Sequence, residues 1–161
     1  MRVETVRFGI LEVDDDQIFT FPMGLLGFAN HKQFLIIDHT HESPFKWMQS
    51  CEDAELAFIL TDPAFFRGDY HISARRGELQ IISPTDAEDL VVSVIMTVPD
   101  DPQDMSANLL APLVFNMANR LAMQYVLTNN RYPVKYYVMR EKDPSPPEQP
   151  GAPEPRSISL R

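Results

Sequence analysis

Cys51 is the only cysteine among the 161 residues, and it is the first side chain to test for nucleophilic chemistry. It lies in the segment QSCEDAEL, beside three acidic residues. Neighbouring carboxylates raise the pKa of a thiol and so lower the fraction of reactive thiolate. Ser50, Ser83 and Ser106 lack the G-x-S-x-G pattern of a nucleophilic serine. The sequence pairs no nucleophile with a base, so we predict no catalytic residue.

Histidines are the next candidates, as metal ligands. His39 and His41 would lie on the same side of a strand, which makes half of a metal site. Neither a carboxylate nor a third histidine stands at a ligand spacing from them, and one cysteine cannot form a thiolate cluster. We interpret both histidines as polar loop residues, and we predict no metal and no cofactor.

Three short acidic runs remain. They are Asp14, Asp15 and Asp16, then Glu52 and Asp53, and finally Asp100 and Asp101. Adjacent acids in turns normally form a solvated surface. Two acids on facing strands could perform acid–base catalysis, an alternative that the sequence leaves open because it cannot place the strands.

The formal net charge of −9, from 23 acidic and 14 basic residues, bears on the choice of partner. Phosphate binding needs clustered basic residues, and the nearest approach to a cluster is the pair Arg75 and Arg76. We therefore predict no direct nucleic-acid partner. A basic protein is the better candidate, because opposite fields speed encounter.

Two aromatic features could belong to an interface. Phe65 and Phe66 are adjacent in DPAFFRGDY, and neighbouring residues of a strand face opposite sides. One ring is thus a candidate interface anchor among charged neighbours. The alternative, that one ring packs inward while the other covers the end of a barrel, is equally good.

The second feature is the turn FTFPMGLLGF. Its glycines, Gly24 and Gly27, do not fit a phosphate-binding or dinucleotide-binding loop. We predict a corner of the core, with Phe21 and Phe28 largely buried and a positive φ at Gly24 or Gly27. A partner-binding rim is the minority alternative.

The elements that position these residues repeat with a period of two, which is typical of strands. VVSVIMTV places Val92, Val94, Met96 and Val98 on one face. LAFIL, KQFLIID, FKWMQS, AMQYVL and PVKYYVM are further short strands between turn signals. We predict an all-β fold, a barrel-like antiparallel sheet or a sandwich.

One segment is ambiguous, because Leu109, Leu110, Leu113, Met117 and Leu121 also fall near one face of a helix. Pro112 would break that helix, so we predict strands that contain the first three leucines and a kink or sheet edge at the proline. Composition alone leaves the two close to even. We expect a helical turn at Pro84–Leu90, capped by Ser83.

The chain divides into a folded domain at residues 1–140 and a disordered or extended proline-rich tail at 141–161, which holds six of the fourteen prolines. Neither a signal-like pattern nor an apolar run long enough for a membrane helix is present. We therefore expect a cytoplasmic protein without a membrane partner.

Four phrases in order resemble the FliW family of flagellar assembly factors. They are FTFPMGLLGF, SPFKWMQSCEDAELAFILTDP, VPDDPQDMSANLLAPLVFN and RYPV, and the similarity covers about residues 1–138. The resemblance implies an all-β barrel-like fold and no enzyme. It implies a protein that binds flagellin and the RNA-binding translational regulator CsrA, and that antagonises the repression of flagellin synthesis by CsrA.

The chain departs from the family pattern after LAPLVFN, where MANRLAMQ keeps only Arg120 of several bases, and at its long tail. We take the acidic runs and Phe65 and Phe66 as candidate contacts to a CsrA-like partner, chosen by expected exposure. A small-ligand-binding barrel with aromatic lining and a barrel hydrolase with paired acids remain as rival classes.

Overall fold

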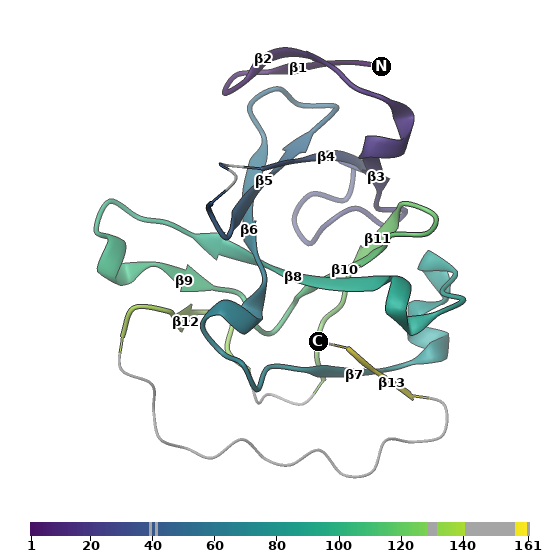
Figure 1. Ribbon diagram of the computed structural model, residues 1–161, viewed down its shortest axis with the longest axis vertical. Helices are drawn as coiled ribbons and strands as arrows, with labels where there is room; N and C mark the ends of the chain where they lie inside the picture. The colour runs from purple at the N-terminus through teal and green to yellow at the C-terminus, as the bar shows by residue number, and fades with distance from the viewer. Residues whose placement is uncertain (39, 41, 129–131, 141–156, 161) are drawn as a thin grey trace.

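The computed structural model of the protein describes residues 1–38, 40, 42–128, 132–140 and 157–160 (Figure 1). The strands, in chain order, are β1 (Arg2–Thr5), β2 (Gly9–Glu12), β3 (Ile18–Thr20), β4 (Gln33–Asp38), β5 (Phe45–Ser50), β6 (Ala57–Thr61), β7 (Ile72–Arg75), β8 (Leu90–Thr97), β9 (Ser106–Ala107), β10 (Leu113–Asn116), β11 (Leu121–Gln124), β12 (Tyr136–Tyr137) and β13 (Ser157–Leu160). Short 3-10 helices are η1 (Asp15–Gln17), η2 (Pro63–Phe65), η3 (Arg76–Ile82), η4 (Ala87–Asp89) and η5 (Pro102–Asp104).

Seven strands close into a barrel, so the predicted all-β, barrel-like fold is confirmed. The order around the ring is β8, β10, β11, β3, β4, β5 and β6, and β6 pairs again with β8. All of these pairs are antiparallel except β11 with β3, which meet in parallel at Leu121 and Thr20. Strands β9 and β12 extend the sheet beyond the end of β8. Figure 1 shows the barrel strands arranged in a ring.

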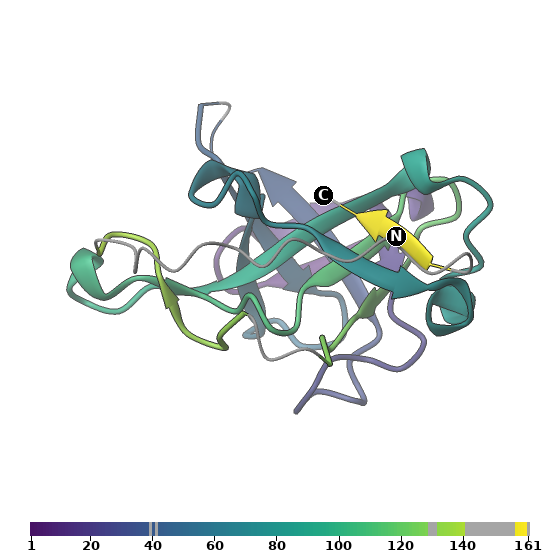
Figure 2. The same cartoon turned by 90° about the horizontal axis from the view of Figure 1, so that it is seen from below.

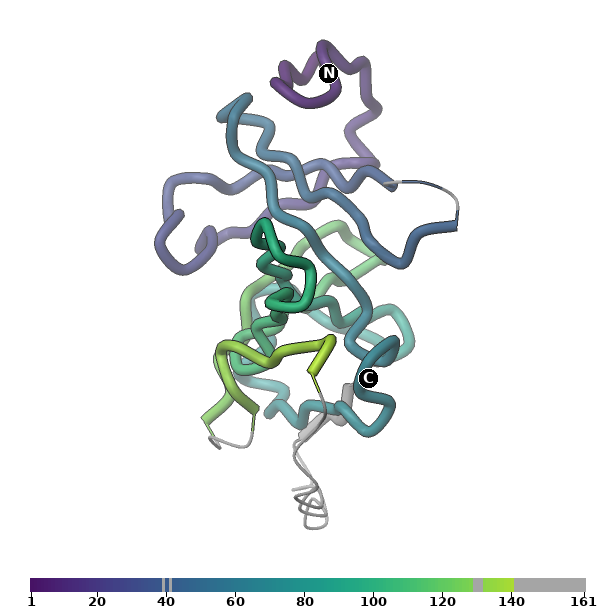
Figure 3. Tube along the Cα trace, turned by 90° about the vertical axis from the view of Figure 1, so that its left-hand side faces the viewer, coloured from purple at the N-terminus to yellow at the C-terminus, as the bar shows by residue number. Residues whose placement is uncertain are grey.

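The N-terminal hairpin of β1 and β2 stands beyond the barrel at one end of the molecule (Figure 3). The amide of Val6 donates to the carbonyl of Ala54 at 3.0 Å, and the guanidinium of Arg7 lies 4.4 Å from the ring centre of Trp47. These contacts attach the hairpin to the end of the β5–β6 pair.

The barrel interior is aromatic. Phe21 packs edge-on against Phe34 and Phe115, with ring centres 5.4 and 5.7 Å apart, and Phe19 packs against Phe115 at 5.0 Å. All four rings are buried. Edge-to-face pairs of this kind add to the stabilisation from burial alone.

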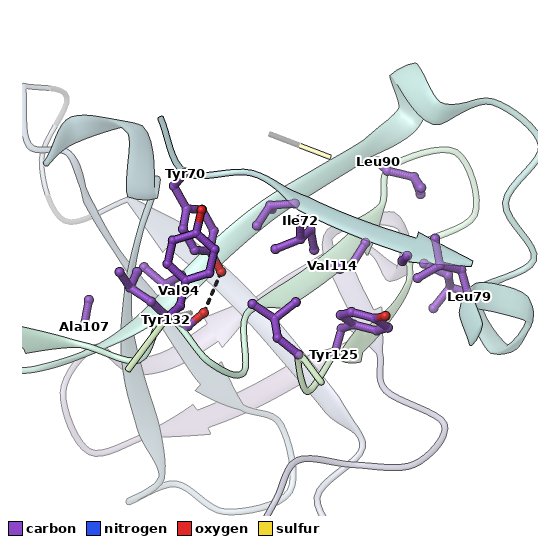
Figure 4. Packing of buried hydrophobic residues seen from close by; sticks show 14 of the residues in the cluster. Tyr70, Ile72, Leu79, Leu90, Val94, Ala107, Val114, Tyr125 and Tyr132 are labelled. Atoms are coloured by element: carbon purple, nitrogen blue, oxygen red, sulfur yellow. Dashed lines mark hydrogen bonds between the residues drawn. The ribbon is translucent and has the colours of Figure 1, made fainter. Parts of the chain in front are cut away.

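A second cluster lies outside the ring, between the wall formed by β8 and β10 and the covering segments β7 and η3 (Figure 4). Val92 and Val94 of β8 face this cluster, as the period of two predicts, whereas Val98 is exposed. The hydroxyl of Tyr70 donates to the carbonyl of Leu109 at 2.8 Å. Burial raises the pKa of Tyr70, which keeps this hydroxyl protonated as a donor.

The turn FTFPMGLLGF is a corner of the core, as predicted. Phe21 is fully buried, and Phe28 is partly buried against the barrel core, with its ring centre 5.3 Å from that of Phe58. Gly24 and Gly27 both have positive φ, +66° and +81°. Met23 and Leu26 point outward, so the same turn also presents apolar side chains to solvent.

The region around Pro112 is not a helix, but only part of it is strand. Leu113 lies in β10, with Pro112 immediately before the strand. Leu109 and Leu110 are outside any strand, contrary to the prediction. Their backbone is held by other partners, since Leu109 donates to Pro133 at 3.1 Å and Leu110 accepts from Leu127 at 2.8 Å.

The helical turn expected at Pro84–Leu90 forms later, as η4, and its cap is Asp86, whose carboxylate accepts from the amide of Glu88 at 2.9 Å. Ser83 instead ends the preceding helix η3, with φ of +48°. The sequence predicted no element at that helix.

Of the segment 141–161, the structure describes Ser157–Leu160, which form β13 and pair with β7. The disorder predicted for the tail does not extend to these four residues. The rest of the tail, like His39 and His41, lies outside the described residues.

Candidate binding surface

The open end of the barrel forms a hollow of about 440 Å³. Six of the seven ring strands contribute to it, because alternate residues of each strand face inward. Its apolar lining is Phe19, Ile36, Leu60, Val91, Phe115 and Met117. Phe19, Leu60 and Phe115 also belong to the barrel core, so the hollow is where that core meets solvent.

Charged side chains surround this mouth. Asp38 and Lys46 lie on adjacent strands and form an ion pair at 3.6 Å. Asp16, from the first acidic run, and Arg120 also line the mouth. The guanidinium of Arg120 lies 5.0 Å from the ring centre of Phe19. The mouth therefore offers an apolar floor with charges of both signs at its rim.

A second hollow of about 310 Å³ adjoins the first and shares four lining residues with it, Lys46, Leu60, Val91 and Ser93. It adds Asp62 and Phe65. Phe65 is 69% exposed, on a helix capped by the carboxylate of Asp62, which accepts from Ala64 at 2.9 Å. Two residues predicted as contacts, Asp16 and Phe65, thus lie at the edges of one continuous surface.

Phe66 has a different position from its neighbour. It is half-buried, and its ring stacks on Tyr136 with centres 5.7 Å apart. Phe66 packs inward, as the alternative interpretation expected for one of the two rings, whereas Phe65 remains exposed. Phe66 is therefore a packing residue in this structure.

The second acidic run is occupied by contacts within the chain. One carboxylate oxygen of Glu52 accepts from the amides of Lys32 and Gln33, at 2.8 and 2.7 Å. Asp53 accepts from the amide of Glu55 at 2.9 Å and lies 3.8 Å from His31. These acids hold the turn after β5 against the start of β4.

The other predicted acids are exposed but scattered. Asp14 lies immediately before η1 and Asp15 is the first residue of that helix, and neither lines the mouth. Asp100 and Asp101 lie in the turn after β8, where Asp101 caps η5 by accepting from Gln103 at 3.0 Å. The nine predicted contact residues therefore lie at several separate places on the structure and do not form one site.

Sequence reasoning missed Lys46 and Asp38 at the mouth, and it noted Arg120 only as a lone base. A usable signal existed for Lys46, since it shares the face of the buried Met48 in the alternating strand FKWMQS. A charged residue in phase with buried ones marks the point where a strand leaves the core.

The environment of Cys51 disfavours nucleophilic chemistry. Burial, and secondarily the charge of Glu52, raises the pKa of Cys51 to about 11. Within the described residues, no three His, Cys, Asp or Glu side chains gather into a possible metal site. In the same part of the chain, no helix has the length and apolarity to cross a membrane.

Comparison with known proteins decides the family. The profile of the FliW protein family matches residues 2–138, which include the whole ring. The chain belongs to the FliW family. The match ends before the segment that contains β13.

Relatives in the FliW family are similar over most of their length. The chain is 37% identical over 142 residues to the flagellar assembly factor FliW of Alkaliphilus metalliredigens (strain QYMF), covering 88% of each. It is 36% identical to the factor of Bdellovibrio bacteriovorus, covering 84% of this chain and 77% of that one. A crystal structure of the flagellar assembly factor FliW superposes with a TM-score of 0.80 at 34% identity, covering 89% of this chain and 100% of that chain.

Proposed function

We propose that this protein is a cytoplasmic flagellar assembly factor that binds flagellin and a CsrA-like translational regulator. Binding would antagonise the repression of flagellin synthesis by that regulator. The observation that carries the proposal is the family match over residues 2–138, together with relatives named as flagellar assembly factors. The proposed role is binding, with no catalytic step, cofactor, metal or direct contact to nucleic acid.

The mouth of the barrel supports a specific contact surface for this role. It combines exposed apolar side chains, Phe65 (69%), Val91 (44%) and Met117 (42%), with charges at the rim. Interfaces typically place aromatic anchors at the centre and polar groups around them. We assign Phe65 as the anchor and Asp14, Asp15 and Asp16 as the acids that face a basic partner.

Two groups of acids are less suited to direct contact. The carboxylates of Glu52 and Asp53 already bind the chain's own amides, and using them for a partner would release the turn after β5. Asp100 and Asp101 lie at a different turn from the residues of the mouth. The sequence predicted them as contacts to the CsrA-like partner, and we now assign them to a second partner that does not bind at the mouth.

The experiment is a titration of purified flagellin and purified CsrA-like protein with the parent chain, a triple Asp14/Asp15/Asp16→Asn variant, Phe65→Ala, and Glu88→Gln as a control at an exposed acid that does not line the mouth. The proposal expects both partners to bind the parent, and the first two variants to weaken at least one of them. Binding of neither partner would overturn the function. Unchanged binding in every variant would keep the function and overturn the surface.

The volume of the mouth favours a second candidate, a barrel that binds a small ligand. About 440 Å³ lies within the usual 300–1,000 Å³ of ligand pockets. Trp47 is a poor reporter for it, since this ring lines a separate hollow of about 170 Å³ with Phe45 and Met105. A Phe19→Trp variant would place the reporter in the mouth. This candidate would be supported if a small molecule quenched the fluorescence of the introduced tryptophan saturably. The same molecule should displace neither flagellin nor the CsrA-like protein.

A further inference from the structure

Strand β7 is covered by a strand from the far end of the chain. Ser157–Leu160 pair with it antiparallel, in the register Ser157 with Arg75, Ile158 with Ala74, Ser159 with Ser73 and Leu160 with Ile72. Among the described strands, β7 pairs with β13 alone. Figure 2 shows β13 (yellow) lying alongside β7. The main-chain groups on this edge of β7 are therefore occupied by the protein's own C-terminal segment.

The register matches the pattern of burial in β7. Ile72 and Ala74 are 1% exposed and face the outer core cluster, whereas Ser73 and Arg75 are exposed. The sequence SISL alternates in the same phase, so its two apolar positions stand opposite the two buried residues of β7. A slip by one residue would set serines opposite the buried positions. The edge therefore selects the order of residues in the strand that it accepts.

The family match does not include this strand. The family match stops at residue 138, and the solved FliW structure is covered over its full length by only 89% of this chain. The described members of the outer core cluster, including Ile72 and Ala74, lie within the matched domain. Strand β13 lies outside that domain and pairs with the edge of a strand inside it.

An uncovered edge strand presents unpaired N–H and C=O groups, which is how extended peptides add to a sheet. We propose that the edge of β7 is a site for an extended peptide segment with alternating apolar and small polar residues, and that Ser157–Leu160 are its resident, removable cover. When the cover leaves, a segment of a partner with the same alternation takes its place by antiparallel pairing.

Tethering sets how strongly the cover competes. A strand attached to its own site by a short connection has an effective concentration of about 1 mM. A free peptide that binds the open edge with a Kd of about 100 μM would therefore bind the covered chain about tenfold more weakly. The cover thus makes the edge selective for partner segments that are tighter binders or are present at high local concentration.

The first test uses a chain truncated after Asp143 and a synthetic peptide of sequence RSISLR, which copies residues 156–161. The truncated chain should bind this peptide about tenfold more tightly than the full chain. A control peptide with both apolar residues replaced by serine should not bind. The amides of β7 should exchange with solvent faster in the truncated chain, and addition of the peptide should slow them again.

The second test keeps the chain at full length and needs no truncated protein to fold. Successive residues of an antiparallel strand direct their N–H groups to opposite edges, so only one of Ile158 and Ser159 donates to β7. Proline removes that donor. Of the variants Ile158→Pro and Ser159→Pro, one should raise the affinity for the peptide about tenfold, and the other should leave it unchanged.

Two results would overturn the proposal. One is a truncated chain that binds neither peptide while the exchange of its β7 amides matches that of the full chain. The other is a pair of proline variants that behave alike. Both readouts are independent of flagellin and of the CsrA-like regulator, so they separate this proposal from the proposed function.

Discussion

At the scale of single residues, neighbours in the sequence can have different structural roles, as the pair Phe65 and Phe66 shows. Phe65 is exposed on η2 beside the mouth, whereas Phe66 stacks on Tyr136. The sequence predicted that the two rings would diverge, because consecutive residues rarely share a face. It could not say which ring points outward, since that depends on where β12 lies.

Phe65→Ala should lower affinity for a partner at the mouth by about 2 kcal/mol, as for a central aromatic anchor, and leave the melting temperature of the protein unchanged. Phe66→Ala should do the reverse. It should destabilise the fold by roughly 1–3 kcal/mol, less than the loss of a fully buried phenylalanine. Thermal unfolding and partner titration of both variants provide the check, and equal effects on stability would contradict the assignment.

Gly24 and Gly27 form a second matched pair of residues. Both have positive φ, but a Cβ at Gly24 would lie 2.7 Å from the backbone of Ala29 and Phe28, whereas at Gly27 it would meet nothing within 4 Å. Gly27→Ala should therefore cost only the left-handed conformation, about 1–2 kcal/mol. Gly24→Ala should cost clearly more, because backbone must also move. Urea unfolding of both variants measures the difference, and similar losses would show that the turn relaxes freely.

Cys51 allows a prediction of pH dependence. Its pKa is raised to about 11, chiefly by burial and also by Glu52, because both disfavour the charged thiolate. Alkylation by iodoacetamide should therefore be slow at pH 8, where roughly one thiol in a thousand is ionised, and should rise steeply towards pH 11. Glu52→Gln should shift the profile slightly to lower pH. A profile centred near pH 8.5 would contradict this environment for the thiol.

At the scale of elements, the sequence predicted what short-range pattern controls and missed what distant contacts control. The strand β8 followed directly from the alternation in VVSVIMTV. Leu109 and Leu110 did not form the predicted strand, since their backbone groups bind Pro133 and Leu127 from other parts of the chain. The mouth could not be predicted either, because it is assembled from six strands that only closure of the ring brings together.

The helix η3 is the clearest element that the sequence did not predict. Its last carbonyl, that of Ile82, accepts from the side-chain amides of both Asn116 and Asn119, each at 2.9 Å. Glu78 of the same helix accepts a hydrogen bond from the hydroxyl of Tyr125. A 3-10 helix of this length is uncommon. It is held by partners more than thirty residues away, which leaves no local signal.

Asn116→Ala should destabilise the protein by about 1–3 kcal/mol, because Asn116 is 1% exposed and its loss leaves buried polar groups unsatisfied. Asn119→Ala should cost less, since Asn119 is exposed and water can replace its amide. Each side-chain oxygen also accepts one backbone amide at 3.0 Å, so the two variants remove equivalent bonds. Chemical unfolding compares them, and a larger loss in Asn119→Ala would contradict the role of burial.

At the scale of the whole molecule, the formal charge of −9 is spread over several turns. Of the three acidic runs, only the first reaches the mouth, through Asp16, while Glu52 and Asp53 are engaged within the fold. The long-range field therefore arises from the whole surface, whereas contact depends on a few residues. Such a field speeds the approach of a basic partner more than it stabilises the final complex.

This separation predicts a specific response to salt. The Debye length falls from about 10 Å at 0.1 M salt to about 3 Å at 1 M, which screens charges spread over a surface. Association with a basic CsrA-like partner should slow steeply across that range, while dissociation changes little. The Asp14/Asp15/Asp16→Asn variant should associate more slowly at low salt and approach the parent at high salt. Phe65→Ala should instead raise the dissociation rate at every salt concentration. Stopped-flow kinetics separate the two rates, and a salt dependence confined to dissociation would show that charge acts within the contact rather than across the molecule.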